Sequence, residues 1–295
     1  MADMNIDGRT ALYALTGQHI GFSPVPEQFN TISGFIGYNS VMLPFDTQND
    51  IHMVLDALQI LNFKGVFVDT PYRCALDELL VNRSEEARQC GSVNAIRMNA
   101  NGLHGHNTEI TAFRKAFPAI TGEELAGKKI FLIGAGGIAR SIAAACALDQ
   151  CDSITIVSRT TEKSHELCNV ANQFCNVATA ADINDIGTIH SFYNSEIIIN
   201  ASSVGMFPQI NVHTLPEGYN VLPHHLVFDT IYHPPQTKLL QTAEEKGCRV
   251  FNGRDIMFFS CLEAFQWWTD VIIDADCEKK LLNIWKEMIY NIYVA

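Results

Sequence analysis

Residues Lys129–Gln150 read KIFLIGAGGIARSIAAACALDQ, an apolar run followed by a glycine turn and a helix of small residues. The run 130–133 is typical of a parallel strand that is buried on both faces. The turn Gly134–Ala139 has the pattern G-x-G-x-x-A, and the small residues continue from Ser141 to Leu148. A strand, a glycine turn and a helix in this order predict the first βα unit of a dinucleotide-binding domain.

The residues of the turn have distinct roles in this interpretation. Gly134 permits the tight turn, Gly136 lets the backbone approach a pyrophosphate, and Ala139 keeps the helix close to the sheet. The helix N-terminus offers free N–H groups and the positive end of its dipole to phosphates. We therefore expect cofactor contacts from Gly134, Ala135, Gly136, Gly137, Ile138 and Ala139. A glycine turn in an α/β core that binds no ligand is the alternative.

Strand and helix patterns alternate on both sides of the turn, which predicts two α/β domains. Before the turn, strands are expected at 11–16, 38–44, 65–68, 92–98 and 103–106, with a helix over 49–61. After it, strands are expected at 154–157, 197–200, 226–229 and 249–251, with helices over 162–172 and 237–246. From Asp255 onward the chain reads as two apolar-striped helices.

These elements define the predicted domain organisation. We expect a Rossmann-type, doubly wound dinucleotide-binding domain over residues 110–253. Residues 1–109 and 254–295 form the predicted substrate-binding and catalytic domain, to which the C-terminal helices return. The fold class is therefore α/β.

Composition narrows the classes of function. The chain has 295 residues, 47% of them hydrophobic and 18% charged, which is the composition of a globular protein. Its net charge is −12 without a basic run, so nucleic acid and anionic membranes are poor partners. The nine cysteines include no C-x-x-C pair, which favours reduced thiols and no metal site. The start has no signal pattern and no apolar run spans a membrane, so we expect a cytoplasmic protein, either monomer or homodimer.

The residues after the second strand of the dinucleotide domain indicate which cofactor binds. An acid at this place holds the ribose of NAD, whereas basic and small residues accept the 2′-phosphate of NADP. Here the sequence has Ser158, Arg159, Thr160 and Lys163. Arg159 can make charge-assisted hydrogen bonds to a phosphate and stack on adenine. We predict NADP, with NAD less favoured, and the missing acid also argues against S-adenosylmethionine.

Several ordered motifs resemble those of the shikimate/quinate dehydrogenase family over nearly the full length of the chain. Gly17–Pro26 is similar to the family's opening G-x-P-[IV]-x-H-S-x-S-P, and Phe67–Arg73 to N-V-T-x-P-x-K. The remaining matches are Gly91–Ala95 with G-A-V-N-T, Gly105–Glu109 with G-x-N-T-D, Ser158–Thr160 with N-R-T, Asn200–Met206 with N-x-T-x-x-G-M, and Asp229–Pro234 with D-x-x-Y-x-P. The resemblance implies an oxidoreductase of aromatic amino acid biosynthesis, which reversibly reduces 3-dehydroshikimate or a related cyclic hydroxy-ketone.

The resemblance also implies the roles of individual residues. A Lys and an Asp act as a pair at the reacting carbon in the family, and these positions are Arg73 and Glu109 here. Two Ser hydroxyls, a Tyr, and Asn, Thr and Gln side chains hold the family's substrate. The corresponding residues are Ser23, Val25, Asp69, Asn94, Tyr232 and Ser260. Further cofactor contacts are implied for Ser202, Met206 and Gly253.

The substrate half departs from the family pattern. Val25 cannot donate a hydrogen bond, Asp69 demands a cation or hydroxyl partner, and Ser260 is shorter than the Gln it replaces. The pKa of arginine is above about 12, so Arg73 stays charged: it can stabilise negative charge but is a poor proton donor. Glu109, or a water that it holds, then has to serve as acid and base.

We expect Arg73 and Glu109 to pair, either as a catalytic couple or as a purely structural salt bridge. Two alternatives to the dehydrogenase stay open. One is an NADP-binding protein that has lost the chemistry. The other is an enzyme that uses the glycine turn for another nucleotide.

Overall fold

The computed structural model describes residues 6–76 and 78–294 of the chain, which divide into two compact units. Unit 1 contains the chain up to Arg88, Val93–Thr108, and the chain from Met257 on. Unit 2 contains Gln89–Ser92 and Glu109–Ile256. Both are α/β, as predicted, and the residues after Met257 belong to unit 1, as predicted for the C-terminal helices.

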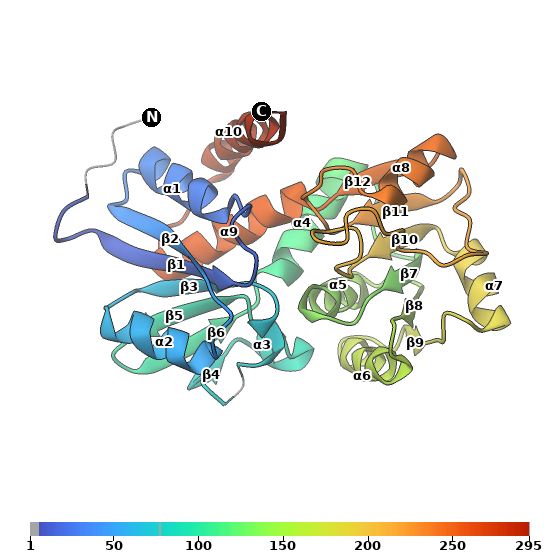
Figure 1. Ribbon diagram of the computed structural model, residues 1–295, viewed down its shortest axis with the longest axis horizontal. Helices are drawn as coiled ribbons and strands as arrows, with labels where there is room; N and C mark the ends of the chain where they lie inside the picture. Colours follow the sequence, from blue (N-terminus) through green and yellow to red (C-terminus); the bar gives the residue numbers. More distant parts are fainter. Residues whose placement is uncertain (1–5, 77, 295) are drawn as a thin grey trace. The chain divides into compact units, whose positions relative to one another are not determined.

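Unit 1 is built on a mixed six-stranded sheet in the order β2-β1-β3-β5-β6-β4 (Figure 1). The strands are β1 (Ala11–Gly17), β2 (Ser40–Asp46), β3 (Gly65–Val68), β4 (Asn82–Arg83), β5 (Ala95–Asn99) and β6 (Gly102–His106). β1 pairs in parallel with β2 and β3, whereas β5 is antiparallel to β3 and β6. A hairpin joins β5 to β6, with Gly102 at a φ of 111°.

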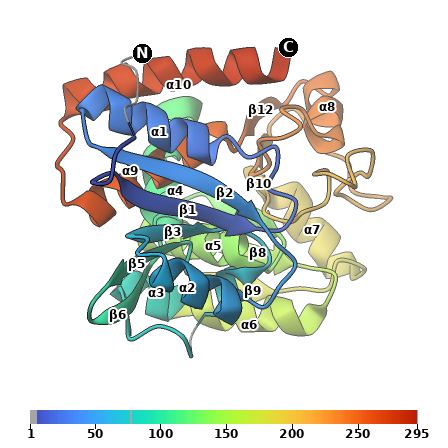
Figure 2. The same cartoon turned by 60° about the vertical axis from the view of Figure 1, so that its left-hand side comes forward.

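Alternating side chains of these strands pack against helices on both faces of the sheet. The helices are α1 (Val25–Ile36), α2 (Ile51–Ile60), α3 (Glu85–Cys90), α9 (Arg254–Thr269) and α10 (Ala275–Val294), with a 3₁₀ turn, η1, at Tyr72–Cys74. Ala14 and Val66 join the apolar core beneath α2 and α3. Tyr13 faces the opposite way, with its ring 4.8 Å from Phe29 of α1 and 5.3 Å from Trp268 of α9. Figure 2 shows α10 lying along α1.

Unit 2 is a doubly wound sheet of six parallel strands in the order β12-β11-β10-β7-β8-β9, which confirms the Rossmann-type prediction. Its strands are β7 (Lys129–Ile133), β8 (Ser153–Val157), β9 (Ala178–Ala180), β10 (Ile197–Asn200), β11 (Leu226–Asp229) and β12 (Arg249–Asn252). Its helices are α4 (Glu109–Thr121), α5 (Gly137–Leu148), α6 (Thr161–Asn172), α7 (Ile186–Asn194) and α8 (Lys238–Glu245). The strand order reverses between β7 and β10, which is where ligands bind in such sheets.

Small residues bring α5 close to the sheet and to α4. Ala139, Ile142 and Ala143 are fully buried. On the same side, Phe113 of α4 contacts Phe228 of β11 at a ring separation of 5.6 Å.

Within the described part of the chain, no helix is both long and apolar enough to cross a bilayer.

The contact between β3 and α9 gives a stability prediction. A Cβ on Gly65 would lie 2.7 Å from the buried indole of Trp268, so Gly65→Ala should lower the free energy of unfolding by about 1–3 kcal/mol. Gly34, exposed within α1 with no atom near its Cβ position, is the matched control, and Gly34→Ala should stabilise by about 0.5–1 kcal/mol. Urea denaturation measures both, and equal effects of the two substitutions would contradict this packing.

Candidate active site

The glycine turn after β7 brings two backbone segments into close approach. Gly134 has a φ of 118°, a region that favours glycine, and its N–H donates to the Val157 carbonyl at 2.8 Å. A Cβ on Gly134 would lie only 2.5 Å from the carbonyl oxygen of Ala201. Glycine at this position therefore lets the ends of β7 and β10 meet at the point where the strand order reverses.

The N-terminus of α5 lies directly after this turn. Gly136 is its N-cap residue, is exposed, and has no atom within 4 Å of a Cβ position. No side chain caps the helix, so the first N–H groups of Gly137, Ile138 and Ala139 are not satisfied by a capping residue. Ala135 completes the turn and is half-buried. An open helix N-terminus with room above its first glycine fits the pyrophosphate of a dinucleotide.

The end of β8 leads into the N-terminus of α6. The Ser158 hydroxyl donates to the Thr160 carbonyl at 2.7 Å and lies 2.9 Å from the Ser164 hydroxyl. These hydrogen bonds hold the turn between strand and helix, and Arg159 and Lys163 are exposed on it. Thr160 is the N-cap residue but makes no side-chain cap. Two cations at an uncapped helix N-terminus fit a phosphate monoester better than a ribose diol.

A buried polar network holds the loops that follow β10 and β11. Asn200 donates through Nδ2 to Asp229 at 3.0 Å, and its Oδ1 accepts from both the N–H and the hydroxyl of Ser202. Asp229 also accepts from the Thr237 hydroxyl at 2.7 Å and from the Ile231 N–H at 3.0 Å. Burial raises the pKa of Asp229 to about 6, in spite of these hydrogen bonds, which lower it. The network shapes the segments that carry the predicted site residues in both loops.

The predicted site residues of these loops have well-defined surroundings. The half-buried Met206 donates its N–H to the Ser203 carbonyl, and Tyr232 is half-buried in the loop after β11. Gly253 follows β12, and a Cβ there would collide with the Thr230 carbonyl. Only glycine therefore allows the chain to pass the β11 loop at this point.

In unit 1, three side chains far apart in sequence form one buried hydrogen-bonded cluster. Asn94 donates through Nδ2 to the hydroxyls of Thr108, at 2.8 Å, and Ser260, at 3.1 Å. The two hydroxyls lie 2.7 Å apart, and Asn94 Oδ1 accepts from the Thr108 N–H. We call Asn94, Thr108 and Ser260 the hydroxyl–amide cluster. Thr108 was not among the predicted site residues, although it belongs to the quoted motif Gly105–Glu109.

The predicted catalytic residue Arg73 lies in η1, next to Asp69. Its Nη2 is 2.9 Å from Asp69 Oδ1, and its Nε donates to the Val68 carbonyl at 3.2 Å. The side chains are 14% and 21% exposed, so solvent screens this ion pair less than a surface pair. Arg73 is therefore the cation partner that we expected for Asp69.

The second predicted catalytic residue, Glu109, begins α4 in unit 2. It is buried, and its Oε2 accepts from the Ser141 hydroxyl of α5 at 3.0 Å. The predicted pairing of Glu109 with Arg73, which belongs to unit 1, stays a prediction. The partner Ser141 was missed from the sequence, where only its position in the small-residue helix was visible.

The remaining two predicted substrate residues lie where β1 leads into α1. Ser23 is half-buried and donates its N–H to the Ile20 carbonyl. Val25 is the first residue of α1 and is only 2% exposed, so its side chain serves the apolar core of unit 1.

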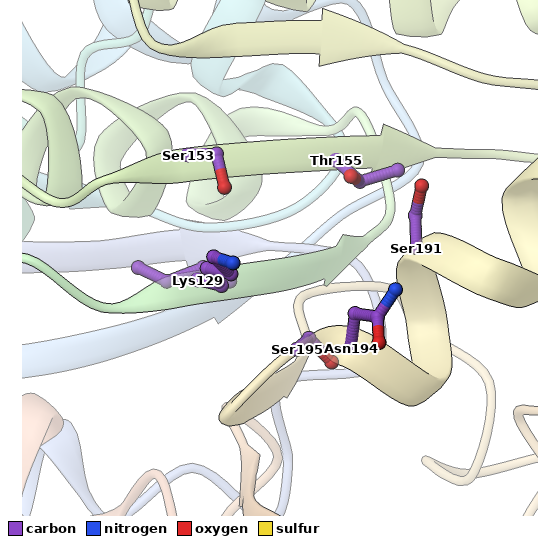
Figure 3. Close-up of a pocket in the computed structure, with 7 residues that line it drawn as sticks. Lys129, Ser153, Thr155, Ser191, Asn194 and Ser195 are labelled. Carbon is purple, nitrogen blue, oxygen red and sulfur yellow. The ribbon is translucent and has the colours of Figure 1, made fainter.

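A cavity of about 200 Å³ lies elsewhere in unit 2 (Figure 3). Lys129 and Ser153 line it at the start of β7 and β8, together with Ser191 and Asn194 of α7. The glycine turn follows the opposite, carboxyl end of β7, so this cavity lies at the other end of the strand from the glycine turn. In the described part of the chain, no group of three His, Cys, Asp or Glu side chains is placed to hold a metal ion.

The fold of unit 2 and its open helix N-terminus define a dinucleotide-binding protein with a second α/β unit. Two family models match the chain: Shikimate / quinate 5-dehydrogenase over residues 117–214, and Shikimate dehydrogenase substrate binding domain over residues 15–96. The shikimate dehydrogenase (NADP(+)) of Alkaliphilus oremlandii is 33% identical over 282 residues, covering 94% of this chain and 98% of that protein.

Solved structures agree with this relationship. The shikimate 5-dehydrogenase of Listeria monocytogenes, in complex with shikimate and NAD, is 30% identical with a TM-score of 0.81, covering 94% of this chain and 98% of that one. A shikimate dehydrogenase in complex with NADP+ is 26% identical, also with a TM-score of 0.81, covering 95% of this chain and 97% of that one.

This chain belongs to the shikimate/quinate dehydrogenase family. The predicted family and the predicted enzyme class, a dehydrogenase acting on CH–OH groups, are thereby confirmed, and the predicted cofactor agrees with the NADP(+) in the relatives' names.

The buried carboxylate of Asp229 predicts a pH dependence of stability. Because its pKa rises from 3.8 to about 6 on folding, the folded state holds a proton between these values that the unfolded state has released. The contribution of this group to stability therefore falls as pH rises from 4 to 6. Asp229→Asn removes this titration, so the variant should gain up to about 3 kcal/mol relative to wild type between pH 4 and pH 7.

Thermal and urea unfolding of both proteins across this pH range measure the difference. Burial lowers the pKa of His225 to about 4, so the contribution of His225 to stability rises with pH. This contribution is the same in wild type and variant and cancels in their difference. Parallel stability curves for wild type and variant would contradict the assignment of this pKa to Asp229.

Proposed function

We propose that this chain is an NADP-dependent dehydrogenase that interconverts a hydroxyl and a ketone on a cyclic, hydroxylated substrate such as 3-dehydroshikimate. The observation that carries the proposal is the pair of uncapped helix N-termini at α5 and α6, the second bearing Arg159 and Lys163. Such a surface suits a dinucleotide with an additional phosphate. The family relationship supports the reaction class.

In this proposal the cofactor, when bound, supplies or accepts a hydride, and the chain positions it. The N–H groups at the start of α5 hold the pyrophosphate, and Gly136 leaves it room. Arg159 binds the 2′-phosphate with help from Lys163, Ser158 and Thr160. Ser202, Met206 and Gly253 lie on segments that we assign to the nicotinamide end.

The assignment of Arg159 predicts a selective loss of affinity. Arg159→Ser should weaken NADPH binding about 10–100-fold, because a charge-assisted hydrogen bond to phosphate is lost, and should weaken NADH binding much less, because only the stacking on adenine is lost there. Isothermal titration measures both. Arg114→Ala is the matched control, because Arg114 is another partly exposed arginine of unit 2 and pairs with Asp149. An equal loss for both nucleotides in Arg159→Ser would exclude the 2′-phosphate contact.

Arg73 and Glu109 divide the catalytic roles in our proposal. Arg73 stays protonated, and its guanidinium orients the substrate oxygen and stabilises negative charge on it. The ion pair with Asp69 fixes the guanidinium on η1, which reduces its freedom. Glu109, or a water held by it, exchanges the proton.

The hydroxyl–amide cluster supports recognition of a hydroxylated substrate. It contains four protons on polar atoms, two on Asn94 and one on each hydroxyl. Three of them are used within the cluster. The remaining hydroxyl proton has no acceptor within the cluster, and in this proposal it is donated to an oxygen of the substrate. Ser23 adds a further hydroxyl in unit 1, and the role of Tyr232 in substrate binding stays a prediction.

A second candidate function is an NADP-binding protein without turnover. The observation that favours it is the position of Arg73, an arginine where the family has its catalytic lysine, bound to an acid where the family has threonine. An arginine neutralised by Asp69 acts as a structural ion pair in this alternative.

Turnover distinguishes the two candidates. Wild type should form NADPH from NADP+ with at least one of shikimate, quinate or a panel of cyclitols. Arg73→Ala should lower kcat about 100–1000-fold, because charge on the substrate oxygen loses its stabilisation. The double variant Arg73→Lys, Glu109→Asp restores the family pair. Activity that appears only in this double variant would contradict catalysis by the wild-type residues and favour the second candidate.

A further inference from the structure

Helix α9 is held on the β5–β6 hairpin by a series of polar and aromatic contacts within unit 1. Trp268 donates its indole N–H to the Ile96 carbonyl at 3.0 Å. Directly after α9, Asp270 pairs with Arg97 at 2.9 Å, and within α9 Ser260 belongs to the hydroxyl–amide cluster. One further contact of α9, at Glu263, lies between these and has no role in the proposed chemistry.

This contact joins Glu263 to His106, the last residue of β6. His106 Nε2 lies 3.1 Å from Glu263 Oε1, and the side chains are only 16% and 23% exposed. An ionised carboxylate only accepts hydrogen bonds, so the imidazole donates through Nε2. The His106 ring also lies 5.1 Å from the Trp267 ring, at an interplanar angle of 35°.

Two further charged residues, Arg97 and Asp270, lie near this pair. Arg97 lies over the Trp267 ring, 4.9 Å from its centre, and pairs with Asp270. His104 lies two residues before His106 on the same face of β6 and opposite Arg97. Glu263 is thus the acidic partner of His106, while Asp270 is that of Arg97.

The spacing along both elements places this pair next to the hydroxyl–amide cluster. Glu263 follows Ser260 by three residues, so both side chains lie on one face of α9. Thr108 follows His106 by two residues. The links His106–Glu263 and Thr108–Ser260 therefore tie the end of β6 to α9 at two adjacent points.

We propose that His106 and Glu263 are a positioning pair that sets the position of α9 on the hairpin and thereby holds Ser260 against Asn94 and Thr108. Neither residue needs to touch a ligand. Ser260 carries a short side chain, so a small displacement of α9 removes its hydroxyl from hydrogen-bonding distance. The effect on turnover rests on the proposed function, whereas the effect on the cluster itself does not.

Two variants at residue 106 separate the hydrogen bond from the ring contact. His106→Phe keeps a ring against Trp267 but loses the donor, and His106→Gln keeps a donor. We expect His106→Phe to raise KM for the substrate about tenfold with kcat within about twofold, and His106→Gln to stay near wild type. Glu263→Met should repeat the effect of His106→Phe and provides a second variant if that protein folds poorly.

The matched control is Asp270→Asn, which breaks the ion pair between the hairpin and the residue directly after α9, away from Ser260. It should leave KM unchanged. In a Ser260→Ala background, which already has a raised KM, His106→Phe should add less than about twofold, because both changes act through one hydroxyl. An undiminished effect of His106→Phe in that background would overturn the proposal, and so would a His106→Gln variant that behaves like His106→Phe.

A measurement without substrate tests the same idea. The side-chain amide of Asn94 gives an NMR signal in ¹⁵N-labelled protein that Asn94→Ala identifies by its loss. His106→Phe and Glu263→Met should shift this signal and speed its hydrogen exchange, whereas Asp270→Asn should not. An unchanged signal in both variants overturns the proposal. A changed signal in a protein that turns over no substrate supports the positioning pair and counts against the proposed function alone.

Discussion

The close approach of Gly134 to the backbone of Ala201 is the constraint on which unit 2 depends. A side chain at residue 134 would stand 2.5 Å from a carbonyl oxygen, and the φ of 118° already favours glycine. Because β7 and β10 meet there, α5 starts at the point where the strand order reverses. The first N–H groups of α5 have no side-chain cap. The same local geometry therefore determines both the fold and the place where a dinucleotide is held.

Each unit uses a buried amide and its neighbours to fix the segments that carry site residues. In unit 2, Asn200 and Asp229 join the loops after β10 and β11, at the cost of burying a carboxyl group. In unit 1, Asn94 joins the end of β6 to α9 through two hydroxyl groups. Satisfied buried networks of this kind are rigid, which is what substrate positioning requires.

Most of the fold was predictable because buried parallel strands are short apolar runs. The runs 130–133, 154–157, 197–200 and 226–229 are all strands of unit 2. β9 has only three residues and α7 only nine, and neither was predicted. The partners of site residues were harder to predict. Ser260 and Asn94 are 166 residues apart in the sequence. Arg73 and Asp69 lie in a segment without regular helix or strand spacing. No local sequence pattern therefore predicts either contact.

The substitutions in the substrate half and the preserved cofactor half together suggest a dehydrogenase adapted within its family. The central claim is that the N-termini of α5 and α6 hold a phosphorylated dinucleotide. Diffraction from crystals grown with NADP+ measures this most directly. We predict the pyrophosphate at the N–H groups of Gly137 and Ile138 and the 2′-phosphate within hydrogen-bonding distance of Arg159. A nucleotide bound away from the glycine turn, or a 2′-phosphate directed away from Arg159, would contradict the claim.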